Sequence, residues 1–263
     1  MNETRLPIAE QIQTMTAKLL ATQPVGYRLC LIGGFRYRLL DASCRASIDL
    51  DYHWEGDLDR KQAEITEVLR KRLLPEVQRR TGYDGTIRPA GGPDADSPAV
   101  RTIEMAFYRA SEPGSRMEIP LEITRIPRFD PPVVRTITGA VFLTVSDADM
   151  IESKILALLN RVFTQARDIL DIFLFQDRLP VDANKRLSQK LADLQLSPED
   201  VTERLRRLRA ARAVHLREIE QILATQVDAP VAANLRAAGG ARMIWDQVLD
   251  RLLDRFIVGE ESP

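Results

Sequence analysis

The spacing of apolar residues divides the chain into a strand-rich first part and a helical second part. At residues 8–20 and 57–80, apolar side chains recur every three or four positions, which predicts amphipathic helices. Shorter apolar or alternating stretches, bounded by Gly, Pro, Asp and Ser, predict strands. These predicted strands and short apolar stretches lie at 27–32, 86–89, 100–108, 117–124, 133–137 and 141–145.

Helical patterns take over after Thr144. Ser146, followed three residues later by Asp149, predicts a helix start with Ser146 as N-cap, so we expect Asp147 and Asp149 to cap a helix rather than to bind a metal. Later helical segments are separated at 197–198, 228–230 and 239–240, which predicts a helical bundle. We therefore expect an α/β domain at 1–145 and a helical C-terminal domain at 146–263.

Composition narrows the class of protein. The chain has 263 residues, of which 44% are hydrophobic and 29% charged, as is typical of a globular protein with a substantial core. No apolar run approaches 18 residues and residues 1–5 do not resemble a secretory signal, so we expect a cytoplasmic protein without a membrane segment. Two histidines make a zinc site improbable, and the net charge of −1 counts against a large RNA-binding surface.

The segment from Gly33 to Asp51 carries the most informative chemistry. In an extended strand from Arg45 onward, Asp49 and Asp51 would share one face, while Ile48, Leu50 and Tyr52 would line the core. Two neighbouring carboxylates repel each other, and Mg²⁺ removes that cost. The pair Gly33-Gly34, which follows an apolar run, allows a turn with amide groups open to phosphate. The alternative is a strand whose acids simply face water.

A third acid is expected from the strand at 117–124. Glu118 and Glu122 would share one face of this strand, with apolar residues on the other. An acid beside Asp49 and Asp51 would complete a site for two metal ions, although exposed strand carboxylates remain the alternative. Pro120 favours an edge position for this strand.

Charged residues recur at seven-residue intervals further along the chain. Lys154, Arg161 and Asp168 would form one stripe if a single helix continued through Phe163 and Thr164. The alternative is a set of salt bridges that also includes Arg167 and Asp171. An arginine-rich stretch at 204–217 is either an RNA-contacting surface or, with its flanking acids, a solvated helix face.

These motifs together resemble a known family. The order of strand, Gly-Gly, helix and Asp-x-Asp resembles the signature of the polymerase-beta-like nucleotidyltransferase superfamily. With 121–124 and the set at 152–171, the chain resembles the AbiEii-type, MenT-like nucleotidyltransferase toxins. One departure is that no hydroxyl residue directly follows the glycines, so Ser47 would have to supply any hydroxyl for phosphate.

The resemblance implies an α/β (α+β) fold, in which a nucleotidyltransferase-like mixed sheet with flanking helices is followed by a helical C-terminal region. It implies Mg²⁺-dependent transfer of a nucleoside monophosphate from an NTP, with release of pyrophosphate. It also implies a toxin with a cognate antitoxin and tRNA 3′ ends as acceptor. The residues that it implicates are Asp49, Asp51 and Glu122 for metal, Gly33, Gly34, Arg45 and Ser47 for the nucleotide, Lys154 for the triphosphate, and Asp168 near the acceptor or ordering the site.

Two other functions stay open at this point. A small-molecule nucleotidyltransferase, such as one that modifies an aminoglycoside, would share the metal site. A catalytically idle protein that binds a nucleotide or a partner would share the fold.

Overall fold

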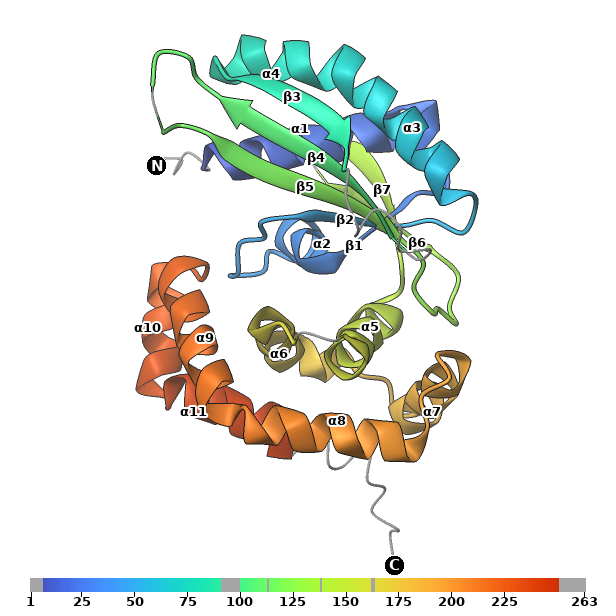
Figure 1. The fold of residues 1–263 in the computed structure, drawn as a ribbon, viewed down its shortest axis with the longest axis vertical. Helices are drawn as coiled ribbons and strands as arrows, with labels where there is room; N and C mark the ends of the chain where they lie inside the picture. The colour runs from blue at the N-terminus through green and yellow to red at the C-terminus, as the bar shows by residue number, and fades with distance from the viewer. Residues whose placement is uncertain (1–6, 91–99, 113, 138, 162–163, 251–263) are drawn as a thin grey trace, which may run out of the picture. The chain divides into compact units, whose positions relative to one another are not determined.

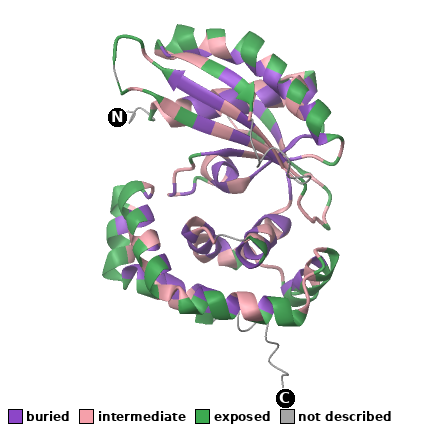
Figure 2. Ribbon diagram, viewed as in Figure 1, coloured by how far each residue is buried: buried purple, intermediate pink, exposed green. Residues whose placement is uncertain are grey.

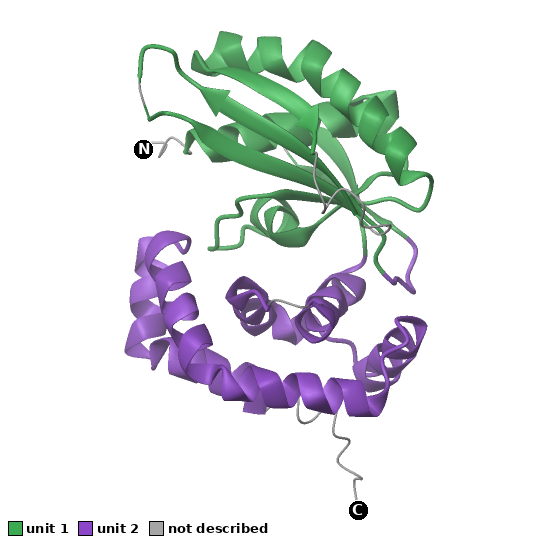
Figure 3. Ribbon diagram, in the orientation of Figure 1, with its two compact units in different colours: residues 1–126, 132–145 green, residues 127–131, 146–263 purple. Residues whose placement is uncertain are grey.

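The computed structural model describes residues 7–90, 100–112, 114–137, 139–161 and 164–250 (Figure 1). Contacts divide the chain into two compact units (Figure 3). Unit 1 holds residues 1–126 and 132–145, and unit 2 holds residues 127–131 and 146–263. The domain boundary expected after residue 145 stays a prediction.

Unit 1 is built on a mixed seven-stranded sheet in the order β3-β4-β5-β2-β1-β7-β6. The pairs β2–β5 and β1–β7 are parallel, and the other neighbours are antiparallel. The strands are β1 (Cys30–Ile32), β2 (Leu50–His53), β3 (Asp84–Pro89), β4 (Val100–Tyr108), β5 (Met117–Thr124), β6 (Val133–Ile137) and β7 (Ala140–Thr144).

Helices flank both faces of this sheet. Figure 1 shows α1, α3 and α4 on one face and α2 on the other. The helices are α1 (Ile8–Thr22), α2 (Gly33–Leu40), α3 (Leu58–Val68) and α4 (Leu74–Thr81). A π-helical turn at Leu69–Leu73 joins α3 to α4 within the long helix predicted at 57–80. It ends two residues before Pro75, whose ring nitrogen cannot donate a helical hydrogen bond.

The two faces of the sheet differ in chemistry. Ile119, Leu121 and Ile123 of β5 are buried on the face that α1 and α3 cover, as their alternation predicts. Glu118 and Glu122 alternate with them on the other face. Figure 2 shows the buried residues concentrated along the strands, with exposed residues on the outer surfaces of α3 and α4.

The predicted strand from Arg45 to Asp51 is wrong in its first part. Strand β2 begins only at Leu50, and residues 45–49 form a loop, so Ile48 is 53% exposed instead of lining the core. The loop is held by Gln13 of α1, whose side-chain amide donates to the carbonyl oxygens of Ser47 (3.0 Å) and Asp49 (3.4 Å). A side chain far away in sequence thus takes the place of a neighbouring strand.

The predicted edge position of β5 is also wrong, because β5 lies between β4 and β2. The register explains how Pro120 is accommodated. Strand β2 pairs with β5 only from Leu121 onward, so Pro120 lies where β5 has β4 as its paired neighbour. At Pro120, β5 is therefore paired on one side only, as a strand at the edge of a sheet is, and proline is tolerated there.

Unit 2 consists of helices, as predicted. They are α5 (Asp147–Asn160), α6 (Ala166–Phe175), α7 (Ala183–Asp193), α8 (Pro198–Ala210), α9 (Arg212–Thr225), α10 (Ala229–Ala237) and α11 (Gly240–Trp245). The hydroxyl of Ser146 accepts the backbone N–H of Asp149 at 3.0 Å, so the predicted N-cap is confirmed. The helices of the described part, 7–250 with its gaps, include none that is long and apolar enough to cross a bilayer.

Asp149 does more than cap a helix. Its carboxylate is fully buried and accepts from the Lys190 ammonium at 2.5 Å and from Arg186 at 3.1 Å. Lys190 also donates to the buried Glu152 at 2.6 Å. Arg186 also donates to Asp130. These hydrogen bonds lower the pKa of Asp130 most, and the hydrogen bond from the Ser146 hydroxyl lowers it further. This buried ion cluster joins α5, α7 and the segment 127–131.

We expect Lys190→Met to destabilise the protein by about 3–5 kcal/mol, because it leaves the carboxylates of Asp149 and Glu152 buried without the cation between them. The matched control is Arg206→Met, which breaks a solvent-exposed pair with Glu203 and should cost far less, because exposed ion pairs contribute little to stability. Urea unfolding of both variants measures the difference. Equal losses would show that the buried cluster does not stabilise unit 2.

Candidate functional site

Two carboxylates meet on neighbouring strands in the middle of the sheet. The parallel register pairs Asp51 of β2 with Glu122 of β5, so both side chains lie on the same face and start from adjacent backbone positions. Both residues are half-buried. Their neighbours Leu50 and Leu121 point the other way and are buried in the core. Two acids from distant segments therefore share one partly accessible position.

Gly33 forms a tight corner against Asp51. It follows β1, begins α2, and has a φ of +75°, a region that favours glycine. A Cβ atom at Gly33 would lie 1.8 Å from Oδ2 and 2.7 Å from Cβ of Asp51. The clash with Cβ could not be relieved by rotating the carboxylate. Only glycine allows the Asp51 side chain to lie against this turn.

Gly34 makes the corresponding close approach to the loop at 45–49. A Cβ atom there would lie 2.3 Å from Nη2 of Arg45 and 2.9 Å from Oγ of Ser47. Arg45 is buried, although it carries a charge. Both side chains therefore lie against the first turn of α2, where backbone N–H groups lack helical acceptors and the helix dipole favours an anion.

Asp49 stands apart from the other two acids in its environment. It is buried and its Oδ1 accepts a hydrogen bond from the Ser47 hydroxyl at 2.9 Å. Gln13 holds the backbone of the same loop, and nothing in the sequence pattern around Gln13 singles it out. The structure thus links the sequence-predicted residues of unit 1 pairwise: Gly33 with Asp51, Gly34 with Arg45 and Ser47, Ser47 with Asp49, and Asp51 with Glu122.

A divalent cation held by protein alone needs several convergent side-chain donors. Among the described residues, no three His, Cys, Asp or Glu side chains converge as a ready-made metal cage. Mg²⁺, however, is commonly held by one or two carboxylates together with water and phosphate oxygens. Asp51 and Glu122 supply such a pair, and the side-chain-free corner at Gly33 lies against Asp51. The chemistry of this position fits a magnesium ion that shares its coordination with a phosphate.

The second predicted set lies in unit 2, and its predicted helical stripe is wrong. Helix α5 ends at Asn160, Arg161 is extended, and α6 begins at Ala166. The prediction required one helix to continue through Phe163 and Thr164, of which Phe163 lies outside the described residues. Lys154 and Asp168 meet across the two helices instead. The break arises before α6, and the seven-residue spacing alone could not show it.

These residues form an ion cluster between α5 and α6. The Lys154 ammonium lies 2.9 Å from Oδ1 of Asp168 and 3.0 Å from Oδ2 of Asp171. Arg161 contacts the second oxygen of Asp168 at 2.7 Å. Both aspartates are fully buried and Lys154 nearly so. This geometry matches the salt-bridge alternative. Because the pairs are buried, breaking one of them would cost far more stability than breaking an exposed pair.

The arginine-rich stretch at 204–217 is largely paired within the helical unit. Arg206 and Arg207 both donate to Glu203 at 2.7 Å, and Arg204 donates to the carbonyl oxygen of Leu159. The hydrogen bonds from Arg206 and Arg207 lower the pKa of Glu203 to about 2. The two pairs belong to a solvated helix face.

The fold is nucleotidyltransferase-like. The sequence profile of the family described as "Nucleotidyl transferase AbiEii toxin, Type IV TA system" matches residues 17–250, so the chain belongs to the AbiEii nucleotidyltransferase toxins. The predicted family, and with it the enzyme class and toxin character, are confirmed. No curated protein in the comparison matches the chain.

Solved structures give the same fold. MenT4, a nucleotidyltransferase toxin from Mycobacterium tuberculosis H37Rv, is 17% identical with a TM-score of 0.51, and the match covers 72% of this chain and 68% of MenT4. A candidate nucleotidyltransferase from H. pylori is 18% identical with a TM-score of 0.50, and the match covers 93% of this chain and 96% of that one. At these identities the similarity concerns the fold, and the predicted mixed sheet with flanking helices and a helical C-terminal region is confirmed.

We expect Gly33→Ala to impair both stability and nucleotidyl transfer, because the added Cβ overlaps the Asp51 side chain. Gly139→Ala is the matched control: its φ of +78° imposes similar strain, but no atom lies within 4 Å of the added Cβ. The control should lose only about 1 kcal/mol of stability to backbone strain. Urea unfolding and pyrophosphate release compare the two. Equal behaviour would show that the contact between Gly33 and Asp51 is unimportant.

Proposed function

We propose that the protein catalyses Mg²⁺-dependent transfer of a nucleoside monophosphate from an NTP to the 3′ end of an RNA, tRNA above all, with release of pyrophosphate. The observation that carries the proposal is the pairing of Asp51 with Glu122 beside the Gly33 corner. Family membership supports the nucleotidyltransferase class and an NTP as substrate. The metal, the acceptor and the residue roles are parts of the proposal.

In this proposal Asp51 and Glu122 hold the metal, with Asp49 as the third acid. Divalent ions in such sites help to deprotonate an attacking hydroxyl and stabilise the departing pyrophosphate. The two acids are only half-buried, which supports direct contact with ion and substrate. Asp49 is held by the Ser47 hydroxyl, so the same hydrogen bond orients an acid and a phosphate ligand.

The nucleotide phosphates are assigned to the first turn of α2. The backbone amides of Gly33 and Gly34 supply donors, while Arg45 and Ser47, packed against Gly34, supply a guanidinium and a hydroxyl. The close approach of Arg45 and Ser47 to Gly34 supports this assignment.

Lys154 and Asp168 keep their predicted roles as part of the proposal: Lys154 provides a cation for the triphosphate and Asp168 orients it. The contact of 2.9 Å between them supports the orienting role. Removal of Lys154 would also leave Asp168 and Asp171 buried without their shared cation. The activity of a Lys154 variant must therefore be measured together with its free energy of unfolding, so that a loss of activity can be told from a loss of folding. A cognate antitoxin is the proposed protein partner, as expected of a toxin in this family.

We expect Asp49→Ala, Asp51→Asn and Glu122→Gln each to lower pyrophosphate release by at least about 100-fold, since loss of a metal contact removes several kcal/mol of transition-state stabilisation. Glu118→Gln is the matched control, because Glu118 lies on the same face of β5 but is exposed and paired with Arg116. Rates are measured with each NTP, Mg²⁺ and cellular RNA. Thermal unfolding confirms that each variant is folded. Parent-like rates in Asp51→Asn would defeat the catalytic assignment.

We expect label from an α-³²P-labelled NTP to enter total tRNA and not an aminoglycoside. Periodate-treated tRNA is the control, because oxidation destroys the terminal ribose diol that would attack the α-phosphate. Label should be lost from the treated RNA. Label on the aminoglycoside would favour the small-molecule alternative. Magnesium-dependent NTP binding without pyrophosphate release would favour the catalytically idle alternative.

A further inference from the structure

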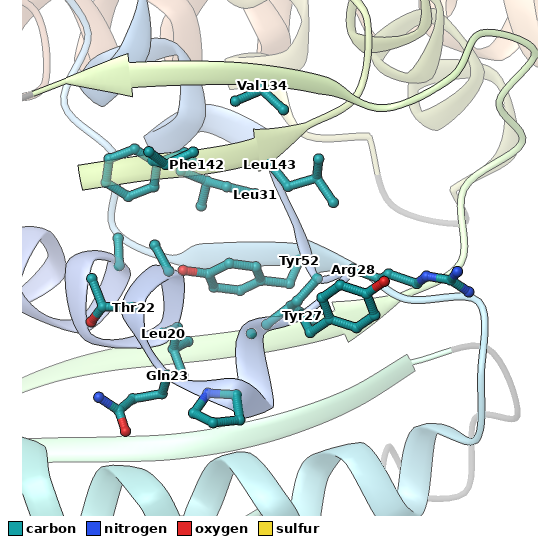
Figure 4. Close-up of a pocket in the computed structure, with 16 residues that line it drawn as sticks. Leu20, Thr22, Gln23, Tyr27, Arg28, Leu31, Tyr52, Val134, Phe142 and Leu143 are labelled. Atoms are coloured by element: carbon teal, nitrogen blue, oxygen red, sulfur yellow. The ribbon is translucent and has the colours of Figure 1, made fainter.

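A cavity of about 580 Å³ lies in unit 1 on the face of the sheet opposite to Asp51 and Glu122 (Figure 4). Helix α1, the turn that follows it and strands β1, β2, β6 and β7 contribute its walls. The lining is mainly apolar and includes Leu20, Leu31 and Phe142. Both the volume and the apolar lining are typical of sites that bind small molecules.

Tyr52 brings one polar atom to this cavity. The side chain is almost fully buried, and its hydroxyl oxygen has no hydrogen-bond partner among the described residues. Figure 4 shows the hydroxyl directed toward α1 between the cavity walls. A tyrosine hydroxyl can donate one hydrogen bond and accept others. An unpaired buried hydroxyl is costly, and a ligand that accepts its hydrogen bond would remove that cost.

The mouth of the cavity carries exposed apolar side chains beside the exposed polar residues Thr22 and Arg28. Tyr27, Val134 and Val141 are 71%, 62% and 54% exposed, and all three line the cavity. Single exposed apolar residues are common on protein surfaces, but several around one cavity are typical of a binding site.

We propose that this cavity binds a small, mainly apolar molecule that carries a hydrogen-bond acceptor for the Tyr52 hydroxyl. A small molecule fits better than a protein segment, because the polar atom lies among buried walls and not along an exposed strand edge. Asp51 and Tyr52 are successive residues of β2 with side chains on opposite faces, so the molecule would bind directly behind the candidate acidic site. The inference does not depend on the reaction proposed above.

The test uses two naphthalene probes of similar shape: 2-acetylnaphthalene, which has a carbonyl acceptor, and 2-isopropylnaphthalene, which has none. Binding to the full chain is measured by isothermal titration calorimetry. Tyr52→Phe should weaken binding of the acetyl probe by about 2- to 10-fold, the worth of one net hydrogen bond, and leave the isopropyl probe unchanged.

Val134→Lys/Val141→Lys is the second variant, which charges two exposed residues at the mouth without altering the buried walls. It should abolish saturable binding of both probes. Unfolding temperatures of both variants serve as the check on folding. The proposal is overturned if the parent protein shows no saturable binding, if Tyr52→Phe binds the acetyl probe as tightly as the parent does, or if the lysine variant retains binding.

Discussion

The parallel register between β2 and β5 is the constraint on which the candidate site depends. Strand β2 has only four residues, and its position is set by apolar side chains: Leu50 lies opposite Leu121 with both fully buried. A slip of one residue would turn Asp51 into the core and Tyr52 toward solvent, at a large cost in free energy. The buried face of the strand thereby fixes the position of the acids on the other face. Core packing and the chemistry of the site are two consequences of one alternating pattern.

This arrangement places unfavourable features next to one another. Like charges directly opposite on neighbouring strands are destabilising, and Gly33 adopts a backbone conformation that other residues rarely adopt. Arg45 is buried in the same region. All three features involve residues of the candidate site. Their concentration in one place follows the general tendency of functional sites to depart from the rules that the rest of a fold obeys.

Much of this fold follows from local sequence, and the exceptions share one cause. Strand β5 and the Ser146 cap were predictable because alternation and capping are short-range signals. The strand predicted from Arg45 failed because Gln13, far away in sequence, holds the loop at 47–49. The edge position of β5 failed because the effect of Pro120 depends on where β2 begins to pair, which only the register shows. In each failure a long-range contact overrode a local preference.

The site residues were predictable to different degrees for the same reason. Asp51, Gly33 and Glu122 came from motifs, yet their contacts required the sheet register and the corner geometry. The family motif selects Lys154, but the sequence alone does not distinguish a lysine that contacts the substrate from one that only forms salt bridges. Lys190 offers the comparison, since each of the two lysines joins two buried carboxylates.

The two lysines differ in how completely the fold encloses them. Lys190 has no exposed side-chain surface, and its cluster lies between α5, α7 and the segment 127–131. The side chain of Lys154 is 10% exposed, and its neighbour Arg161, which shares Asp168, is 40% exposed. A cation that contacts a substrate needs some exposed side-chain surface, and a fully buried cation has none. Burial therefore excludes Lys190 from direct contact with a nucleotide and leaves Lys154 compatible with it, a distinction that residue type and spacing do not contain.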